Sequence, residues 1–524
     1  ANDPVPQISP VLHQPLKIDA KDFNRHYARQ LPMPYTVLSD LDATQMARFQ
    51  EQFTNNLVAG IEQEYTRYYP YTNVAAHVLG YVKKNNESAV GEDAYFSYRL
   101  TDYVGMSGVE GEFDSELRGR AGEESVMVNN LGYRQSENVW TPPEPGKNLV
   151  LTIDLDIQRA AEEAIARRFG ATVRAAAVVM NVRTGDVLAM VSSPTFDPNE
   201  FAQGLTVAQW QQIQTLTAEK NRATYDNYAP GSIFKTIVGL AALEKGLNPD
   251  QLFTVEADPD KPGQSMIYVG RRKIRDTVPP GEYNFRRALM HSSNSYFITN
   301  GLRAGVENII RMGDQFHLGQ ETGLLPRQET AGQFPTLQRV ESSDWHDGDT
   351  ANLCIGQGEI AVTPIQMAVW ISAIANGGTL FKPRLASRLE PQDTSSGELA
   401  TIFPAGIVLG HVRVHPRSLQ VVRNAMLADV ESSEGTGTAA AVPGLNICGK
   451  TGTAQVQDEH NHFIGYNFWF ASFAPYEHPQ YAVIVMVQGM HGGGGTICAP
   501  VAHDIYEAIL KSEHSGSLQN VANN

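Results

Sequence analysis

Ser232 and Lys235 are the residues whose types and spacing most clearly suggest chemistry, because no other serine in this chain has a lysine three positions later. Apolar residues recur at helical spacing from Ile233 to Leu243, which predicts a helix that Gly246 could end. On one helix face the amine lies beside the hydroxyl, and a partly desolvated lysine can take the proton of a serine. Backbone N–H groups at a helix start can hold an oxyanion. The pair predicts a serine nucleophile, although an ordinary helix start with a solvated lysine has the same pattern.

A second short motif, Ser292-Ser293-Asn294, follows further along the chain. A serine next to the lysine can pass a proton to a leaving amine, and the asparagine amide can hold a substrate backbone and fix the lysine. Ser-x-Asn is a weak signal by itself. It occurs again as Ser136-Glu137-Asn138, but that copy precedes Ser232 and is interpreted as chance.

A third motif, Lys450-Thr451-Gly452-Thr453, occurs once. Lys450 adds positive charge for a substrate carboxylate, and the hydroxyls of Thr451 and Thr453 can bond to the same group. Gly452 allows a substrate to approach the backbone of a strand edge. The alternative is an ordinary strand end with a turn, an interpretation that weakens once the three motifs occur in this order.

The order Ser-x-x-Lys, Ser-x-Asn, Lys-Thr-Gly is typical of penicillin-binding proteins and class A β-lactamases. The chain as a whole resembles a class B penicillin-binding protein, a monofunctional peptidoglycan D,D-transpeptidase, over about residues 60 to 510. The run from Phe468 to Val487 and the glycines that follow look most like the elongation-type, PBP2-like branch. The other segments that carry the resemblance are Tyr69-Pro70, 76–82, 108–111, 117–122, 151–158, 177–191, 356–358, 363–368, 492–495 and 499–502.

This resemblance implies an acyl-enzyme mechanism with no cofactor. Lys235 would deprotonate Ser232, which would attack the bond between the two terminal D-alanines of a peptidoglycan stem peptide. Ser292, Asn294 and Lys450 complete the implied catalytic set, and Thr451, Gly452 and Thr453 the implied substrate-binding set. A β-lactam would acylate Ser232 and remain bound. The implied role is cell-wall elongation and maintenance of cell shape.

Other functions fit the same motifs. A division-type transpeptidase, a D,D-carboxypeptidase and a β-lactamase share all three, and a β-lactam sensor or an assembly scaffold would be non-catalytic. The residues before position 145 resemble the class B pedestal, which a lone hydrolase does not need. The pedestal is the expected contact for a membrane glycosyltransferase and other elongation-machinery partners, by analogy with the family.

The chain departs from some PBP2 proteins in one respect. Those proteins carry a zinc site of Asp, His and Cys just before the second motif, but no Cys or His lies between positions 251 and 290 here. A tetrahedral zinc site needs such ligands, so the sequence predicts no metal.

The predicted fold class is α+β, with a pedestal domain at 1–145, a penicillin-recognising transpeptidase domain at 146–512 and a disordered tail at 513–524. Strands from both ends of the second domain around a helical middle predict an antiparallel sheet flanked by helices. The expected elements of this domain are a strand at 148–153, a helix at 155–169, a hairpin at 175–192, strands at 454–456, 467–474 and 481–487, and a helix at 499–511.

The composition limits which functions and which cellular compartments are possible for this chain. Apolar content of 42% with 19% charged residues is that of a folded globular protein. A formal charge of −16 without a basic block argues against nucleic acid. Three cysteines are too few for a disulfide scaffold, so buried free thiols are expected. The chain lacks an apolar run of 18 residues and starts without a signal pattern. The resemblance implies a membrane anchor before residue 1, with the catalytic domain facing the periplasm or cell exterior.

Overall fold

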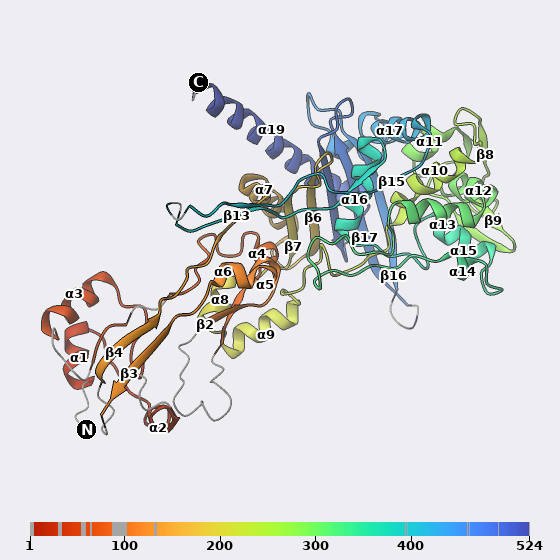
Figure 1. The fold of residues 1–524 in the computed structure, drawn as a ribbon. Helices are drawn as coiled ribbons and strands as arrows, with labels where there is room; N and C mark the ends of the chain where they lie inside the picture. The colour runs from red at the N-terminus through yellow and green to blue at the C-terminus, as the bar shows by residue number, and fades with distance from the viewer. Residues whose placement is uncertain are drawn as a thin grey trace. The chain divides into compact units, whose positions relative to one another are not determined.

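The chain divides into two compact units in the computed structural model (Figure 1). The first unit contains residues 1–68, 82–104 and 114–147, and the second contains 69–81, 105–113 and 148–524. Two short segments of the expected pedestal therefore belong to the second unit. The structure describes residues 5–29, 34–53, 59–62, 65–85, 102–129, 134–393, 395, 397–457, 460, 462–490 and 492–522.

The first unit has a small apolar centre between α1 (Val5–Leu12) and α3 (Ala43–Gln52), where Ile8, Leu12 and Phe49 are buried. Asp42 and Gln45 form a capping box that starts α3. The other elements of this unit are α2 (Ala20–Arg29), β1 (Val82–Asn85), β2 (Asp102–Gly105, whose last residue belongs to the second unit), α6 (Asp114–Arg118) and the hairpin of β3 (Glu123–Val128) and β4 (Arg134–Thr141).

A five-stranded antiparallel sheet in the order β16-β17-β18-β6-β7 forms the centre of the second unit. Strands from the two ends of this unit meet where β18 pairs with β6, with Ile484 opposite Val178. This arrangement confirms the predicted antiparallel sheet. The strand bounds are β6 (Arg174–Asn181), β7 (Val187–Ser193), β16 (Cys448–Gln457), β17 (Phe463–Ala474) and β18 (Tyr481–Gln488).

Helices cover both faces of this sheet, which explains why β18 is apolar at nearly every position. Ala482, Ile484 and Met486 face the cluster that contains α16 (Pro364–Asn376). The alternate residues of β18 face α7 (Leu155–Phe169) and α19 (Ala499–Ala522). Figure 1 shows α16 against the sheet and α7 and α19 on its other side.

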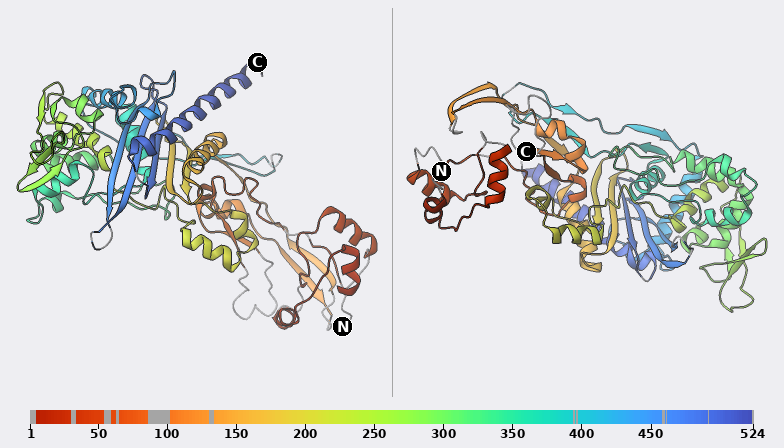
Figure 2. Two further views of the ribbon diagram at one scale, coloured as in Figure 1. Left: turned by 180° about the vertical axis from the view of Figure 1, so that it is seen from behind. Right: turned by 90° about the horizontal axis from the view of Figure 1, so that it is seen from below.

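Most of the other helices of the second unit form the region that carries the first two motifs, beyond the sheet in both views of Figure 2. They are the 3₁₀ turn η2 (Gly231–Phe234), α10 (Lys235–Glu244), α11 (Phe285–Met290), α12 (Asn294–Ala304), α13 (Val306–Gln315), α14 (Leu337–Val340), α15 (Asp347–Cys354) and α17 (Pro416–Glu431). Small ribbons pair β8 (Phe253–Val255) with β11 (Gly281–Tyr283), β9 (Met266–Val269) with β10 (Arg272–Arg275), β12 (Thr379–Phe381) with β15 (Val408–His411), and β5 (Asn148–Leu151) with β13 (Ala386–Glu390) and β14 (Thr401–Ile402).

Within its described residues, the second unit also contains five further α-helices and the 3₁₀ turn η3 (Thr438–Ala440). The five helices are α4 (Ala76–Leu79), α5 (Gly108–Glu112), α8 (Pro198–Gln203), α9 (Val207–Leu216) and α18 (Gly494–Ile497).

The end of the chain differs from expectation. Helix α19 continues to Ala522, beyond the end expected near residue 511, so residues 513–522 of the tail that the sequence predicts to be disordered are helical. Residues 523–524 lie outside the described part. The polar residues after Lys511 lack apolar periodicity, which is why the pattern did not predict a longer helix.

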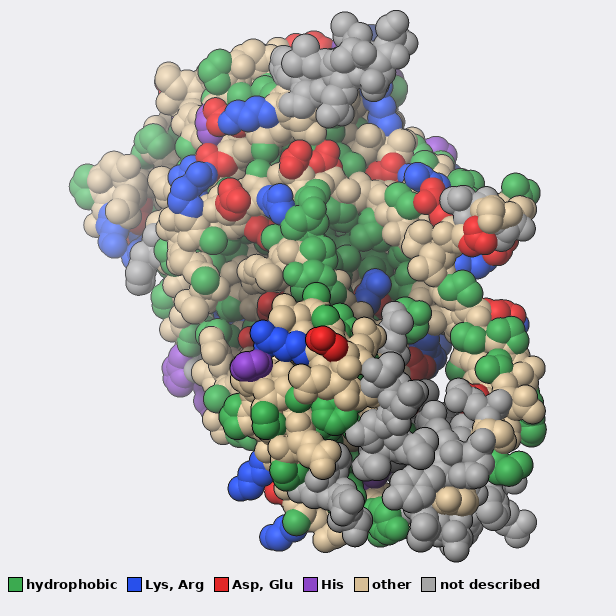
Figure 3. Space-filling view, turned by 90° about the vertical axis from the view of Figure 1, so that its left-hand side faces the viewer, with side chains coloured by type: hydrophobic (Ala, Val, Ile, Leu, Met, Phe, Trp, Pro, Cys, Tyr) green, Lys and Arg blue, Asp and Glu red, His purple; other side chains and the backbone are tan. Residues whose placement is uncertain are grey.

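The three cysteines Cys354, Cys448 and Cys498 are buried free thiols, as predicted. Burial raises the pKa of the Cys354 thiol to about 12, so this thiol stays protonated and unreactive at neutral pH. Acidic and basic side chains are interspersed on the face seen in Figure 3, in line with the absence of a basic block in the sequence. Within the described ranges, no helix combines the length and the apolar character needed to cross a bilayer.

The central sheet predicts a strong effect of core truncation. Ile484→Ala removes methylene groups from a fully buried position, so we expect a loss of about 2–5 kcal/mol in the free energy of unfolding. Ile402→Ala is the matched control, because Ile402 is 64% exposed. Chemical denaturation followed by fluorescence measures both. Equal unfolding midpoints for the two variants would contradict the placement of β18 in the core.

Candidate active site

The first motif lies in a tight turn rather than on a continuous α-helix. Ser232 is inside η2, and α10 begins at Lys235. A 3₁₀ turn has three residues per turn, so side chains three apart are eclipsed and both point to one side. Ser232 is partly exposed, whereas Lys235 has no exposed surface. The turn therefore presents a hydroxyl to solvent with a buried amine behind it.

Glycines on both sides allow this turn to fit between two backbone segments. Gly231 has a φ of +57° and its N–H donates to the Gly356 carbonyl at 3.0 Å. A Cβ at Gly231 would lie 2.7 Å from the Thr453 carbonyl oxygen, and one at Gly356 would lie 2.0 Å from the Gly231 carbonyl oxygen. A side chain at Gly231 would push the turn away from β16, and one at Gly356 would push it away from the Gly356 segment, so both close approaches require glycine.

Lys235 directs its amine at the second motif. Its Nζ donates to the Ser292 carbonyl at 2.6 Å, to Asn294 Oδ1 at 2.7 Å and to Ser292 Oγ at 3.2 Å. Burial lowers the pKa of Lys235 to about 7; the nearby charge of Asp276 opposes this shift and that of Lys450 adds to it. An amine with this pKa is substantially neutral near pH 7 and can accept a proton.

The second motif lies in the connection between α11 and α12. Ser292 has a φ of +65°, a left-handed conformation that a non-glycine residue rarely adopts. Ser293 caps α12 by accepting a hydrogen bond from the Tyr296 N–H at 3.2 Å. Asn294 also donates through Nδ2 to the Arg275 carbonyl at 3.1 Å. These bonds orient Ser292 and Asn294 towards Lys235.

Asp276 holds this connection from the other side. Its carboxylate accepts hydrogen bonds from Ser293 Oγ at 2.8 Å, from the Asn294 N–H at 2.6 Å and from the Ser295 N–H at 2.7 Å. A carboxylate at the first turn of α12 also interacts favourably with the helix dipole. Sequence reasoning examined the segment around Asp276 only for metal ligands and missed this contact, for which the sequence gives no signal.

The third motif lies on β16, which is an edge strand of the sheet. Gly452 faces the turn of the first motif, since a Cβ there would lie 2.8 Å from the Pro230 carbonyl oxygen. Trp469, opposite Gly452 on β17, donates from Nε1 to the Ala229 carbonyl at 3.0 Å. The sheet thus holds both the third motif and the segment that leads into Ser232.

Lys450 is also fully buried. Its Nζ donates to the Thr451 carbonyl at 3.2 Å and to Thr451 Oγ1 at 3.4 Å. Burial lowers the pKa of Lys450, and Asp429 on α17 opposes this shift. Sequence reasoning missed Asp429, although it lies at helical spacing from the apolar residues Val422 and Met426, where an acidic residue is unusual.

The structure therefore brings together the three motifs that the sequence singled out. Lys235 contacts Ser292 and Asn294, and the turn of Ser232 packs on the strand of Lys450, Thr451, Gly452 and Thr453. Among the described residues, no three His, Cys, Asp or Glu side chains form a group that could hold a metal ion. The arrangement can deprotonate a serine, stabilise an oxyanion and bind an anionic group.

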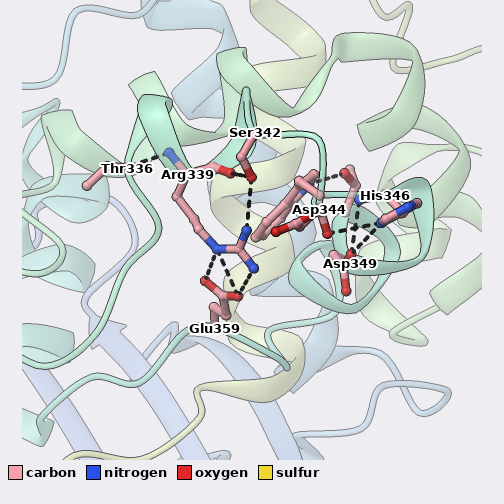
Figure 4. Close-up of polar contacts among 9 residues, drawn as sticks. Thr336, Arg339, Ser342, Asp344, His346, Asp349 and Glu359 are labelled. Atoms are coloured by element: carbon pink, nitrogen blue, oxygen red, sulfur yellow. Dashed lines mark hydrogen bonds and ion pairs between the residues drawn. The ribbon is translucent and has the colours of Figure 1, made fainter.

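A polar cluster next to this site supports the segment that contains Gly356 (Figure 4). Arg339 Nη2 and Glu359 Oε1 are 2.6 Å apart, and Arg339 Nε adds hydrogen bonds to both carboxylate oxygens. The guanidinium lies 5.5 Å from the ring centroid of Trp345, whose Nε1 donates to Thr350 Oγ1 at 2.9 Å. The figure also shows His346 close to Asp349 and Asp344, where it starts α15. The ion pair thus links α14 to Glu359, which lies three residues after Gly356.

Comparison with known proteins identifies the family of both parts of the chain. Residues 175–507 match the penicillin binding protein transpeptidase domain, and residues 3–151 match the penicillin-binding protein dimerisation domain. The peptidoglycan D,D-transpeptidase MrdA of Escherichia coli K12 is 30% identical over 510 residues, which cover 92% of this chain and 77% of that protein.

Two solved structures are similar over most of the chain. PBP2 of Pseudomonas aeruginosa in complex with WCK 5153 has a TM-score of 0.68 at 29% identity, covering 86% of this chain and 92% of that one. The complex of PBP2 with MreC from Helicobacter pylori has a TM-score of 0.71 at 25% identity, covering 94% of this chain and 92% of that one.

The close packing of the serine turn predicts a steric effect at Gly356. Gly356→Ala places a Cβ against the Gly231 carbonyl oxygen and requires a positive φ, so we expect a loss of at least about 1–3 kcal/mol in stability. Gly170→Ala is the matched control, because Gly170 also has a positive φ but no atom within 4 Å of an added Cβ. Thermal unfolding measures both. Equal losses would show that φ alone, and not the packing of the turn, sets the effect.

Proposed function

This chain belongs to the penicillin-binding protein family, and we propose that its acyl-enzyme chemistry takes place at Ser232. The protein is a peptidoglycan D,D-transpeptidase of the elongation type. The observation that carries the proposed site is the amine of Lys235, which is buried, has a pKa lowered to about 7 and lies three residues from a partly exposed serine. Such an amine is poised to take the serine proton.

The proposed first step forms an ester. Lys235 takes the proton of Ser232 Oγ, and this oxygen attacks the carbonyl carbon between the two terminal D-alanines of a stem peptide. The backbone N–H groups of Ser232 and Thr453 hold the oxyanion. The C–N bond then breaks, and the nitrogen of the departing D-alanine takes a proton from Ser292, which Lys235 resupplies across the 3.2 Å contact.

The second step transfers the acyl group. An amine from a neighbouring stem peptide attacks the ester carbonyl and gives one proton to Lys235. An amide bond forms as the ester C–O bond breaks, and Lys235 returns that proton to Ser232 Oγ. The products are a cross-linked peptide and the free enzyme. A β-lactam follows only the first step, because its opened ring stays attached and blocks the approach of the acceptor amine.

The edge strand β16 supports the binding of an extended peptide. The free edge of a sheet can pair with an added strand through main-chain hydrogen bonds, and Gly452 leaves room next to the turn of Ser232. The positive charge of Lys450 and the hydroxyl groups of its strand suit the terminal carboxylate of the stem peptide. Asn294 orients the peptide backbone and Lys235.

The first unit supports a role in a larger assembly. This unit lies within the residues that match the dimerisation domain. A hydrolase that acts alone does not need such a domain. We propose that this unit contacts elongation-machinery partners, including a membrane glycosyltransferase, since the similar Helicobacter protein was solved in complex with MreC. The substrate lies outside the cytoplasmic membrane, so we propose that the catalytic unit works on that side.

Intact-mass analysis after incubation with benzylpenicillin tests the proposed nucleophile. We expect a stable mass increase of one ligand on the native chain, because deacylation is slow in a transpeptidase. Ser232→Ala should show no adduct, and Ser115→Ala, which removes an exposed serine of the first unit, should behave like the native chain. If the native chain stays unlabelled and the drug stays intact, the protein would be a non-catalytic scaffold. If the drug is consumed and the native chain carries no adduct, the protein would be a β-lactamase.

The pKa of Lys235 predicts the pH dependence of acylation. Below about pH 7 the amine carries a proton and cannot accept another, so the acylation rate should rise with pH through a midpoint near 7. A fluorescent penicillin measures the second-order rate constant from about pH 6 to about pH 8. Lys245→Gln, which changes an exposed lysine at the end of α10, should keep the midpoint. A rate independent of pH over this range would exclude Lys235 as the base.

A further inference from the structure

Asp429 is a buried carboxylate next to the third motif that the mechanism above does not use. It has no exposed surface, and it lies near the end of α17. Its Oδ1 accepts hydrogen bonds from the Thr436 N–H at 2.8 Å and from Thr436 Oγ1 at 2.6 Å. A backbone hydrogen bond from Thr451 also lowers the pKa of this carboxyl, although Oδ2 makes no hydrogen bond of normal geometry within the described ranges. A buried carboxylate is costly without a nearby positive charge, and Lys450 supplies one.

The hydroxyl groups near Asp429 form a chain with a fixed direction. Thr436 Oγ1 has one proton, which it donates to Asp429 Oδ1. Thr436 can therefore only accept at its 2.6 Å contact with Thr451 Oγ1, so Thr451 must donate there. The oxygen of Thr451 is then left to accept from Lys450 Nζ at 3.4 Å. Asp429 thus sets the donor and acceptor roles of each group up to Lys450.

The loop that carries Thr436 is packed too closely to change this arrangement easily. The Gly437 N–H donates to the Asp429 carbonyl at 3.0 Å. A Cβ at Gly435 would lie 2.1 Å from that same carbonyl oxygen, and one at Gly495 would lie 1.9 Å from the Thr436 carbonyl oxygen. Thr436 is therefore held between α17 and the segment before α19.

The two threonines of the third motif differ in their exposure to solvent. Thr451 is 7% exposed and its proton is already engaged, whereas Thr453 is exposed. Only Thr453 has a hydroxyl free to donate outwards. The sequence had assigned both threonines to the substrate carboxylate, and the direction of the hydrogen-bond chain distinguishes them.

We propose that Asp429 is a positioning residue of this transpeptidase: it keeps Lys450 positively charged and, through Thr436, engages the proton of Thr451, so that Thr453 binds the substrate carboxylate beside the positive charge of Lys450. This inference rests on the proposed function of the site. Thr451 then acts on Lys450 and not on the substrate. No other residue in the proposed mechanism supplies a negative charge to Lys450.

The charges around Lys450 fix the direction of the expected pH effect. Burial lowers the pKa of Lys450 and raises that of Asp429, and each group opposes the shift of the other. Lys235 on α10, near Asp276, has a pKa lowered to about 7 and is therefore neutral in the alkaline range where Lys450 loses its proton. His291 and Glu434 are paired with each other at 3.2 Å next to the loop of Thr436. Removing the charge of Asp429 lowers the pKa of Lys450 further, so Lys450 loses its proton at a lower pH.

The test uses the full chain and measures how the rate constant of acylation by a fluorescent penicillin depends on pH. The carboxylate of the penicillin is the probe. Asp429→Asn keeps the shape and the acceptor for Thr436 but removes the charge. We expect the pH at which the rate constant falls on the alkaline side to decrease by about one unit or more. At pH values above this fall, the rate constant of the variant should be roughly tenfold lower than that of the native chain. Asp314→Asn is the control for the loss of a negative charge outside the site, because Asp314 is an exposed acid on α13.

Substitutions at Thr436 keep the proposal testable if Asp429→Asn does not fold. Thr436→Val removes the hydroxyl link and Thr436→Ser retains it. We expect the valine variant to be acylated several-fold more slowly with an unchanged alkaline fall, and the serine variant to restore the rate. Thr453→Val should weaken initial binding of the penicillin more than Thr451→Val does.

Two results would overturn the proposal. One is an alkaline fall at the same pH in Asp429→Asn and the native chain, which would reduce Asp429 to a structural role. The other is an equal acylation rate for Thr436→Val and Thr436→Ser. This result overturns the proposal even if Asp429→Asn does not fold. Failure of the proposed function looks different, because the native chain would then be unlabelled or Ser232→Ala would still be labelled.

Discussion

The burial of two lysine amines in one site is the constraint on which the rest of this structure depends. Lys235 and Lys450 have no exposed surface, and the charge of Lys450 makes it more costly to charge Lys235. An ammonium group removed from water must find acceptors or a counter-charge, or lose its proton. The protein treats the two lysines differently: Lys235 has a pKa lowered to about 7, while Lys450 has a fully buried carboxylate nearby.

The environment of Lys235 explains the shape of the second motif. Two of its three acceptors belong to Ser292, whose backbone is in a left-handed conformation that turns its carbonyl and hydroxyl to the same amine. That conformation is unfavourable for serine by itself. Asp276 offsets it by accepting three hydrogen bonds from the residues that follow. The acid–base chemistry and the local backbone strain are therefore linked at one connection between two helices.

The central sheet provides the rigid side of the site. β16 is held through β17 and β18 to the strands from the beginning of the second unit, so the third motif lies on a firmly paired strand at the edge of the described sheet. The turn of Ser232 fits against this strand only because Gly231, Gly356 and Gly452 leave no side chain between the backbones. A nucleophile held in this way loses little entropy when a substrate binds.

The sequence by itself determined the three motifs, the serine nucleophile as a hypothesis, and the antiparallel sheet with its flanking helices. These follow from local spacing and apolar periodicity, which a short segment carries without its neighbours. The tertiary structure decided which amine contacts which oxygen, and it revealed Asp276 and Asp429. Each acid is distant in the sequence from the lysine that it influences, or lies in a loop without periodicity, so no spacing rule relates them. The direction of the chain from Thr451 through Thr436 to Asp429 likewise exists only once folding has removed water from all three groups, because in water each hydroxyl would bond to solvent instead.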